Sequence, residues 1–234
     1  MLEKLLEDGF KELNITPGSA ALAGYRLYYE RLEETNKVMN LTAISGEEDV
    51  ARLHFLDCAA LLGMYDFKGK RVIDVGTGAG FPGLALKIAE TDMELVLLDS
   101  LDKRIGFLKE TCSALELDGV DCVHARAEEA SAEYREAFDI ATSRAVARMN
   151  VLCEMCLPFV KRGGAFIAMK GPDCEEELKE AEHAIKELGA EVIKCEKYTV
   201  PGTDIVHSAI IIKKLRNTPK KYPRRWAQIK KQPL

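Results

Sequence analysis

The sequence predicts an α/β fold: a seven-stranded, mostly parallel sheet with helices on both faces, an antiparallel C-terminal hairpin and an N-terminal helical cap. A short apolar strand at 72–75 leads through a glycine-rich turn into an apolar helical segment at 81–90. From there to residue 188, strand-like and helix-like segments alternate, which is typical of a parallel sheet. The last two strand-like segments, 191–199 and 206–213, are joined by a loop too short for a crossover, so they must be antiparallel.

The first 66 residues predict the helical cap. Apolar residues recur at helical spacing over the first dozen residues and again from 20 to 36. Ser45-Gly-Glu-Glu48 has the pattern of a capping box, and it predicts a third helix that ends near residue 64. We therefore expect three units: a cap at 1–66, a nucleotide-binding domain at 67–215 and a tail at 216–234.

The remaining elements of the domain follow from the same apolar patterns. Further strands are expected at 94–98, 120–124, 138–142 and 164–169, and helices at 102–117, 149–158 and 174–188. Five strand–helix units and the closing hairpin together account for seven strands. This is the Rossmann-like architecture of nucleotide-binding domains.

Composition indicates an ordinary globular protein, with 234 residues, 47% of them hydrophobic and 30% charged. No apolar run approaches the roughly 20 residues of a membrane span, and the charged N-terminus is unlike a signal peptide. Seven cysteines without the spacing of a disulfide framework indicate reduced thiols. We expect a cytoplasmic protein with no membrane partner.

Charge is distributed unevenly along the chain, whose net charge is −5. From Lys213 to the end there are nine Lys or Arg residues and no Asp or Glu. An acidic body with a basic tail is typical of a protein that binds a polyanion through a local surface. Tyr222 and Trp226 lie within this tail, and aromatic side chains stack on bases. The alternative is a solvated, frayed terminus.

The glycine turn indicates which nucleotide is bound. A dinucleotide motif would place its third glycine at 81, but Phe81 stands there and the glycines are Gly76, Gly78 and Gly80. Asp74, two residues before the first glycine, would repel a pyrophosphate and attract a sulfonium group. D-x-G-x-G-x-G therefore resembles the first motif of class I S-adenosylmethionine (SAM) methyltransferases. The alternative is a turn that only packs helix on strand.

Other cofactor contacts are expected where the next strands end. Asp99 ends a strand about 20 residues after the glycines, where a carboxylate can accept both ribose hydroxyls; NAD enzymes use the same device. A backbone N–H at Ala127 can face adenine N1, and Glu128 can accept from the exocyclic amine. The alternative for Glu128 is an exposed acid in a first helical turn. Thr77 and Ser100 adjoin these positions and complete the expected set.

Arg144 and Lys170 follow the fourth and fifth strands, at the edge where α/β sheets bind ligands. Arg144 is expected to pair with the methionine carboxylate of SAM or with a substrate phosphate, and Lys170 with a phosphate. The alternatives are a surface salt bridge and a solvated lysine. Cys153 and Cys156 form a lone C-x-x-C within a predicted helix, so no metal site is expected. No role is assigned to the other histidines, His124, His183 and His207.

Several segments, in the same order, resemble the bacterial rRNA small-subunit methyltransferase G family, long called glucose-inhibited division protein B. They are N-L-T-A, H-F-L-D, D-V-G-T-G-A-G-F-P-G, L-L-D-S, R-A-E, S-R-A-V-A, M-K-G and Tyr222-Pro-Arg, and the resemblance runs from about residue 20 to the end. It implies methyl transfer from SAM to N7 of a guanine in the 530 loop of 16S rRNA, either naked or in an assembling 30S subunit. We expect the enzyme to be a monomer.

The resemblance also implies site residues. By motif match the cofactor contacts are Gly76, Phe81, Ala127, Glu128 and Arg144. Candidates on the substrate side are Asn40, His54, Asp57, Arg144, Lys170 and Arg224. Asn40 and His54 are expected to close over the SAM pocket; alternatively, His54 and Asp57 form an internal pair that docks the cap. Two departures are visible: Cys58 replaces the usual Ser, and the segment after Arg224 is atypical.

No proton-abstracting residue is expected, because guanine N7 carries a free lone pair and needs no general base. Catalysis would then consist of alignment and electrostatic stabilisation of a cationic product. The absence of an N/D-P-P-Y/F motif, the signature of amino-group methylases, agrees with N7. The alternatives are a SAM methyltransferase of a small molecule or protein, and a non-catalytic nucleotide-binding regulatory protein. An NAD-dependent oxidoreductase fits least well.

Overall fold

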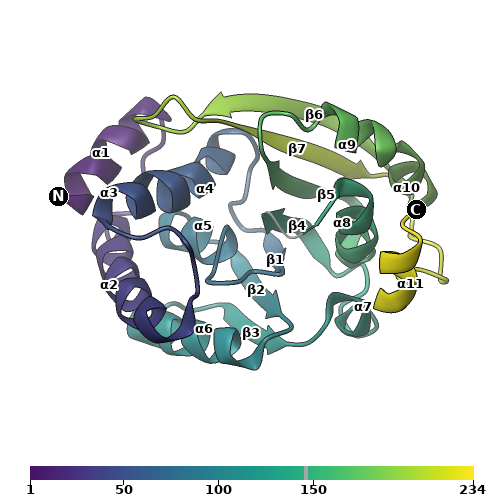
Figure 1. Cartoon of the computed structure of the whole chain (residues 1–234), viewed down its shortest axis with the longest axis horizontal. Helices are drawn as coiled ribbons and strands as arrows, with labels where there is room; N and C mark the ends of the chain where they lie inside the picture. Colours follow the sequence, from purple (N-terminus) through teal and green to yellow (C-terminus); the bar gives the residue numbers. More distant parts are fainter. Residues whose placement is uncertain (145–146) are drawn as a thin grey trace.

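The computed structural model describes residues 1–144 and 147–234. Seven strands form one sheet in the order β3-β2-β1-β4-β5-β7-β6 (Figure 1). All neighbouring pairs are parallel except β5–β7 and β6–β7, which are antiparallel, so the predicted architecture is confirmed. The strands are β1 (Arg71–Val75), β2 (Glu94–Asp99), β3 (Val120–His124), β4 (Phe138–Arg144), β5 (Val160–Lys170), β6 (Ala190–Thr199) and β7 (Val206–Lys214).

The helices divide between the two faces of the sheet (Figure 1). Helices α1 to α4, which form the cap, pack together with α5 and α6 on one face of the sheet. Helices α7 to α11 lie on the other side. They are α1 (Leu2–Glu12), α2 (Ala21–Met39), α3 (Glu47–Val50), α4 (Asp57–Ala59), α5 (Gly83–Ala89), α6 (Asp102–Ala114), α7 (Ala127–Ala130), α8 (Met149–Cys156), α9 (Glu175–Glu180), α10 (Glu182–Glu187) and α11 (Trp226–Lys231).

Alternation along the strands produces two separate cores. Successive side chains of a strand point to opposite faces, so Val72 joins the core on the cap side and Ile73 the opposite core. The cap helices share the first core with α5 and α6, so among the described residues the cap forms no separate core of its own. Where the chain divides into units therefore stays a prediction.

The third cap helix begins differently from the prediction. Gly46, not Ser45, is the N-cap, with φ of 85°, and no side chain caps the helix. The glutamates of the expected capping box are engaged elsewhere: Glu47 forms an ion pair with Arg26, and Glu48 with Arg52. The run continues through a π-helical segment, Ala51–Leu56, into α4 and a final 3-10 turn that ends at Gly63.

Most other boundaries agree closely with the predictions, but β5 begins at Val160 and not at 164, and three differences concern helices. The single helix expected at 174–188 is interrupted at Ala181 and forms α9 and α10. Two short helices were not predicted: α7 has one turn, and α11 lies in the basic tail. Among the described residues, no helix is long and apolar enough to cross a membrane.

Helix α2 ties the cap to the glycine turn of the sheet. The hydroxyl of Tyr25 donates to the carbonyl of Ala85 in α5 at 2.7 Å, and that of Tyr28 donates to the carbonyl of Ala79 in the turn itself. Both tyrosines are fully buried. Since the turn lies between β1 and α5, these bonds fix the cap directly over the carboxyl edge of the sheet.

Candidate functional site

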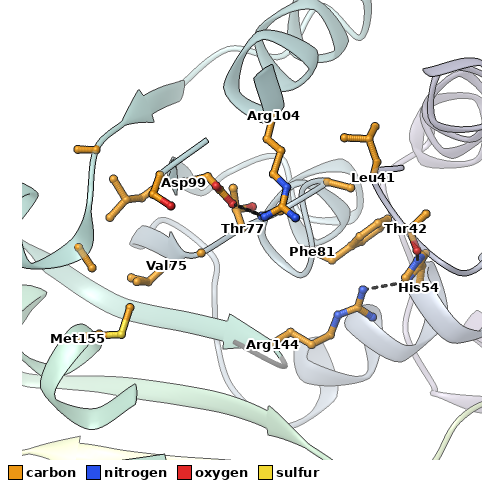
Figure 2. A pocket seen from close by; sticks show the side chains of 17 residues that line it. Leu41, Thr42, His54, Val75, Thr77, Phe81, Asp99, Arg104, Arg144 and Met155 are labelled. Atoms are coloured by element: carbon orange, nitrogen blue, oxygen red, sulfur yellow. Dashed lines mark hydrogen bonds and ion pairs between the residues drawn. The ribbon is translucent and has the colours of Figure 1, made fainter. Parts of the chain in front are cut away.

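A cavity of about 430 Å³ opens where β1, β2 and β4 end, beneath the segment that follows α2 (Figure 2). Its volume is in the range of small-molecule sites, and its position is where parallel α/β sheets bind ligands. It is lined by Leu41, Thr42, His54, Val75, Gly76, Thr77, Gly78, Ala79, Phe81, Leu98, Asp99, Ser100, Arg104, Ala125, Ala127, Arg144 and Met155. We call it the cofactor cavity.

The glycine turn forms the floor of this cavity. Gly76, Gly78 and Gly80 have φ values of 71°, 62° and 108°, which favour glycine. Gly78 lines the cavity, and a Cβ there would meet no atom within 4 Å. Gly80, predicted as a cofactor contact, does not line it: its Cα packs under the cap, where a Cβ would lie 2.5 Å from the hydroxyl oxygen of Tyr28.

We expect Gly80→Ala to destabilise the fold by about 2–5 kcal/mol, from a positive-φ cost of ~1–2 kcal/mol and overpacking of ~1–3 kcal/mol. Gly78→Ala is the matched control. It carries the φ cost alone because its Cβ meets open space, so it should lose only ~1–2 kcal/mol. Urea unfolding of both variants measures the difference; equal losses would show that Gly80 is required for its dihedral angles only.

Asp74 supports the turn from below rather than facing the ligand. It is fully buried, and its Oδ2 accepts from the Thr77 hydroxyl at 2.7 Å and from the Gly83 N–H at 2.8 Å. Burial raises the pKa of its carboxyl to about 6, against the lowering effect of these donors. Its side chain does not line the cavity, so the expected attraction of a sulfonium by Asp74 would act from beneath the turn and not by direct contact.

Asp99 is placed as the sequence predicted, at the end of β2 and on the cavity wall. It is 4% exposed. Its Oδ1 accepts from the Leu101 N–H at 2.9 Å, and its Oδ2 accepts from the Gly78 N–H at 2.9 Å. Arg104 in α6 approaches Oδ2 at 3.3 Å (Figure 2). Arg104 was missed by the sequence reasoning, although it lies one helical turn beyond the expected acid.

The apolar end of the cavity suits an adenine ring. Ala127 lines it at the start of α7, together with Leu98 and Met155, which reaches in from α8 (Figure 2). Ser100 also lines the cavity, as expected. Glu128 is half-buried and lies outside the lining, so in this conformation the structure brings only Ala127 of the predicted adenine pair to the cavity.

Arg144 and His54 form one wall of the cofactor cavity. Nη2 of Arg144 donates to Nδ1 of His54 at 2.7 Å, and Nε2 of His54 lies 2.8 Å from the hydroxyl of Thr42. Both groups lie against Phe81: the His54 ring stacks on it with centroids 4.1 Å apart, and the Arg144 guanidinium lies 4.9 Å from its centre. Burial, and then the charge of Arg144, lower the pKa of His54 to about 3, so its ring is neutral and accepts from the arginine.

A second cavity of about 420 Å³ shares the Arg144–His54 wall. Besides Arg144 and His54, three polar residues line it: Asp57, Lys170 and His207. Its remaining lining residues are Ile44, Leu53, Met169, Gly171 and Ile205. We call it the second cavity.

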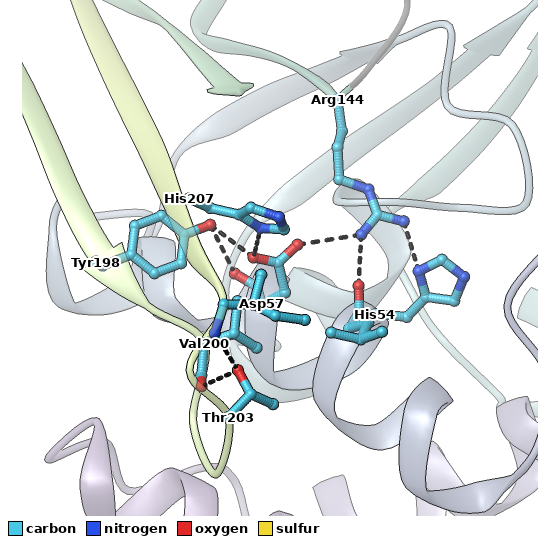
Figure 3. A network of polar contacts seen from close by, with 9 residues as sticks. His54, Asp57, Arg144, Tyr198, Val200, Thr203 and His207 are labelled. Carbon is cyan, nitrogen blue, oxygen red and sulfur yellow. Dashed lines mark hydrogen bonds and ion pairs between the residues drawn. The ribbon is translucent and has the colours of Figure 1, made fainter. Parts of the chain in front are cut away.

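Asp57 is the centre of a polar network beside the second cavity (Figure 3). It is 1% exposed; its Oδ1 accepts from the Tyr198 hydroxyl at 2.7 Å and lies 2.8 Å from Nδ1 of His207. Its Oδ2 accepts from Nη1 of Arg144 at 3.3 Å. His54 and Asp57 are not bonded to each other, so the predicted pair is wrong in detail: Arg144 joins them. Giving His207 no role was also wrong.

The other expected substrate residues have different surroundings. Lys170 donates to the carbonyl of Ala147 and to Oε2 of Glu177, both at 2.7 Å, so its charge is already paired. Asn40 is exposed in the left-handed C-cap of α2, outside both cavities. Ser143 and Arg144, the first residues of the S-R-A-V-A stretch, end β4, and residues 145 and 146 lie outside the described residues.

Arg224 lies in the tail and forms a buried ion pair. Its Nε and Nη2 donate to the carboxylate of Glu154 in α8 at 2.8 and 2.6 Å, and Glu154 is fully buried. Tyr222 and Ile229 are buried as well. The tail is therefore a packed element and not a frayed terminus, and Arg224 does not lie at either cavity.

Cysteines do not contribute to a metal site in the part of the chain that the structure describes, where no group of three or more His, Cys, Asp or Glu side chains could hold an ion. Cys153 and Cys156 are both fully buried in the core. Cys58, which replaces the usual serine, is also buried, and burial raises the pKa of its thiol. None of the three faces a cavity.

Comparison with known proteins adds family information to this geometry. The family model described as rRNA small subunit methyltransferase G matches residues 22–205. The chain is 50% identical to "Ribosomal RNA small subunit methyltransferase G" of Alkaliphilus oremlandii, over 100% of this chain and 99% of the relative. It is 47% identical to the protein of the same name from Clostridium perfringens, over 90% and 89% of the two chains.

Solved structures with low sequence identity share the fold. A branched-chain polyamine synthase mutein from Thermus thermophilus superposes with a TM-score of 0.62 at 17% identity, covering 86% of this chain and 65% of that one. TrmN from Thermus thermophilus gives 0.54 at 21% identity, over 68% and 48%. M. jannaschii TYW2 in complex with AdoMet gives 0.52 at 14% identity, over 62% and 69%.

Proposed function

The chain belongs to the rRNA small subunit methyltransferase G family, and we propose that it transfers the methyl group of SAM to N7 of a guanine in the 530 loop of 16S rRNA. The observation that carries this proposal is the pair of cavities that meet at the Arg144–His54 wall. A methyl donor and its acceptor must approach each other directly. The two cavities adjoin at Arg144 and His54, which line both of them.

The cofactor cavity fits SAM by the chemistry of its lining. Asp99 presents a buried carboxylate for the ribose hydroxyls, and the apolar surface of Leu98, Ala127 and Met155 suits adenine. Arg144 supplies a cation for the methionine carboxylate at the opposite side. SAM supplies an electrophilic methyl group, and the electron pair of the broken C–S bond remains on sulfur.

The second cavity suits a flat acceptor base with polar edges. Its apolar lining can pack on the faces of a purine, and Asp57, Lys170 and His207 lie at its margin. N7 carries its own lone pair, so the residues have to align the base and need not remove a proton. Methylation makes the base cationic, and the carboxylate of Asp57 is the group that favours this charge.

The substrate is proposed to be 16S rRNA, either naked or in an assembling 30S subunit, and the enzyme a cytoplasmic monomer. Fewer cations of the tail are available to contact RNA than its composition suggested. Lys214 is buried and donates to backbone carbonyls, and Arg224 is paired with Glu154. Lys221 is exposed but forms an ion pair with Glu187, and the other exposed cations of the tail are Arg216, Lys220, Arg225, Lys230 and Lys231.

The test is incubation with labelled SAM and 16S rRNA or 30S subunits that lack native modifications, followed by chain cleavage at N7-methylguanine. One modified guanine in the 530 loop is the expected result. Methylation of a different site would reject the proposed position and leave the chemistry standing. SAM binding without transfer to RNA or to 30S subunits would reject the rRNA substrate and favour a small-molecule or protein acceptor.

A further inference from the structure

The Asp57 carboxylate is held by donors from three different strands. Arg144 lies at the end of β4, Tyr198 in β6 and His207 in β7, while Asp57 itself begins α4 of the cap. A buried carboxylate requires such donors, because an unpaired one would be strongly destabilising. The network therefore joins the cap to the antiparallel hairpin, and it includes Arg144, which lines both cavities.

His207 is the member of this network whose charge changes near neutral pH. Its hydrogen bond to Asp57 raises its pKa above the usual 6.5, against the opposing effects of partial burial and of Arg144. Tyr198 stays protonated because burial and Asp57 raise its pKa, and Arg144 stays charged. Lys170, on neighbouring β5 and at the same cavity, is compensated by Glu177.

We propose that His207 is a positioning residue that sets the charge at the second cavity, and that methyl transfer is fast only when its imidazole is neutral. This inference rests on the proposed function and extends it to a residue that neither the family motifs nor the sequence reasoning singled out. His207 holds Asp57 in place through Nδ1 in either protonation state, since that nitrogen can carry a proton in both.

The direction of the effect follows from the charges. With neutral His207, the Asp57 carboxylate and the Arg144 guanidinium carry no net charge together, so the network does not oppose the positive charge that develops on the base. A proton on His207 gives the network a net positive charge, which repels the developing charge on the base. As pH rises through the pKa of His207, which lies above 6.5, the rate of methyl transfer should therefore rise.

Two other groups near the site must be separated from His207. His54 does not titrate in the relevant range, because its pKa is about 3. Asp74, with a pKa of about 6, ionises under the glycine turn and can contribute its own pH dependence. Since Asp74 does not contact His207, its contribution persists in a His207 variant and can be subtracted.

The experiment compares wild type with His207→Asn from pH 5.5 to 8.5, measuring single-turnover methyl transfer to unmodified 30S subunits. Asn places an amide N–H where Nδ1 stood but cannot take up a proton. For wild type we expect a rate roughly tenfold lower at the acidic end, as for one charge at partly screened short range. The Asn variant should keep most of the rate that wild type has at alkaline pH, and it should lose the part of the acidic decrease that His207 causes. His207→Ala should be slow throughout.

His183→Asn is the matched control, because His183 is exposed on α10, and it should keep the wild-type profile. The imidazole signals of His207, followed by NMR, should titrate above pH 6.5 in wild type and lower in Asp57→Asn. A His207→Asn variant with the same pH profile as wild type, or a His207 signal that titrates at the usual pH, would overturn the inference while methylation itself continues. If neither wild type nor any variant methylates RNA, the proposed function is wrong, and the inference that rests on it is wrong as well.

Discussion

Asp99→Ala is expected to weaken SAM binding by at least about 100-fold. In the proposed complex the carboxylate accepts both ribose hydroxyls, and hydrogen bonds to a charged group contribute about 1.5–3 kcal/mol each. The same side chain orders the turn, because its Oδ2 accepts from the Gly78 N–H and its Oδ1 from the Leu101 N–H. Isothermal titration calorimetry with SAM measures the loss directly.

Asp102→Asn is the control for this variant. Asp102 lies three residues further on, at the start of α6, and its side chain is 85% exposed, so its removal should leave SAM affinity unchanged. Asp99→Asn should give an intermediate affinity, since it keeps one oxygen acceptor and loses the charge. If Asp99→Ala binds SAM as tightly as wild type, the ribose lies elsewhere and the assignment of the cofactor cavity is wrong.

The sequence predicted the elements that depend on local patterns. Strands β1 to β7 were readable because apolar runs and turn residues mark them, and the short loop before β7 decided the antiparallel pairing. Asp99 and Ala127 were readable for a similar reason: they follow strands, and strand ends meet at one edge of a parallel sheet. For such residues, position along the chain determines position in space.

Residues whose partners lie far away in the chain were not predictable in this way. His207 meets Asp57 across 150 positions, and Tyr198 meets it across 141. No local pattern of β6 or β7 indicates that their side chains face a carboxylate from the cap. A polar residue at the second position of β7, in a strand otherwise rich in isoleucine, was the only signal available.

Asp74 shows a different limit of motif reasoning. The motif correctly marked the turn, but the sequence cannot tell whether a carboxylate faces a ligand or the backbone beneath it. Here the Gly83 N–H and the hydroxyls of Thr77 and Thr142 surround it, and the role is to hold the turn closed. The ion pair of Arg224 was not predictable for the same reason, since its buried partner lies 70 positions earlier.

Arg224→Ala is expected to destabilise the protein by about 3–5 kcal/mol at neutral pH, the usual cost of removing one partner of a buried ion pair. Glu154 would be left fully buried with a single remaining donor, the backbone N–H of residue 224 at 2.8 Å. Urea unfolding at neutral pH measures the loss.

Two further variants distinguish a structural role of Arg224 from contact with RNA. Arg225→Ala removes the neighbouring exposed arginine and should change stability by no more than about 0.5 kcal/mol. Arg224→Met combined with Glu154→Gln should recover most of the lost stability, because no buried charge remains unpaired. A stable Arg224→Ala protein that binds SAM normally and has lost RNA affinity would instead return this arginine to the substrate. The geometry favours the first result, since the Arg224 guanidinium donates to both carboxylate oxygens of Glu154.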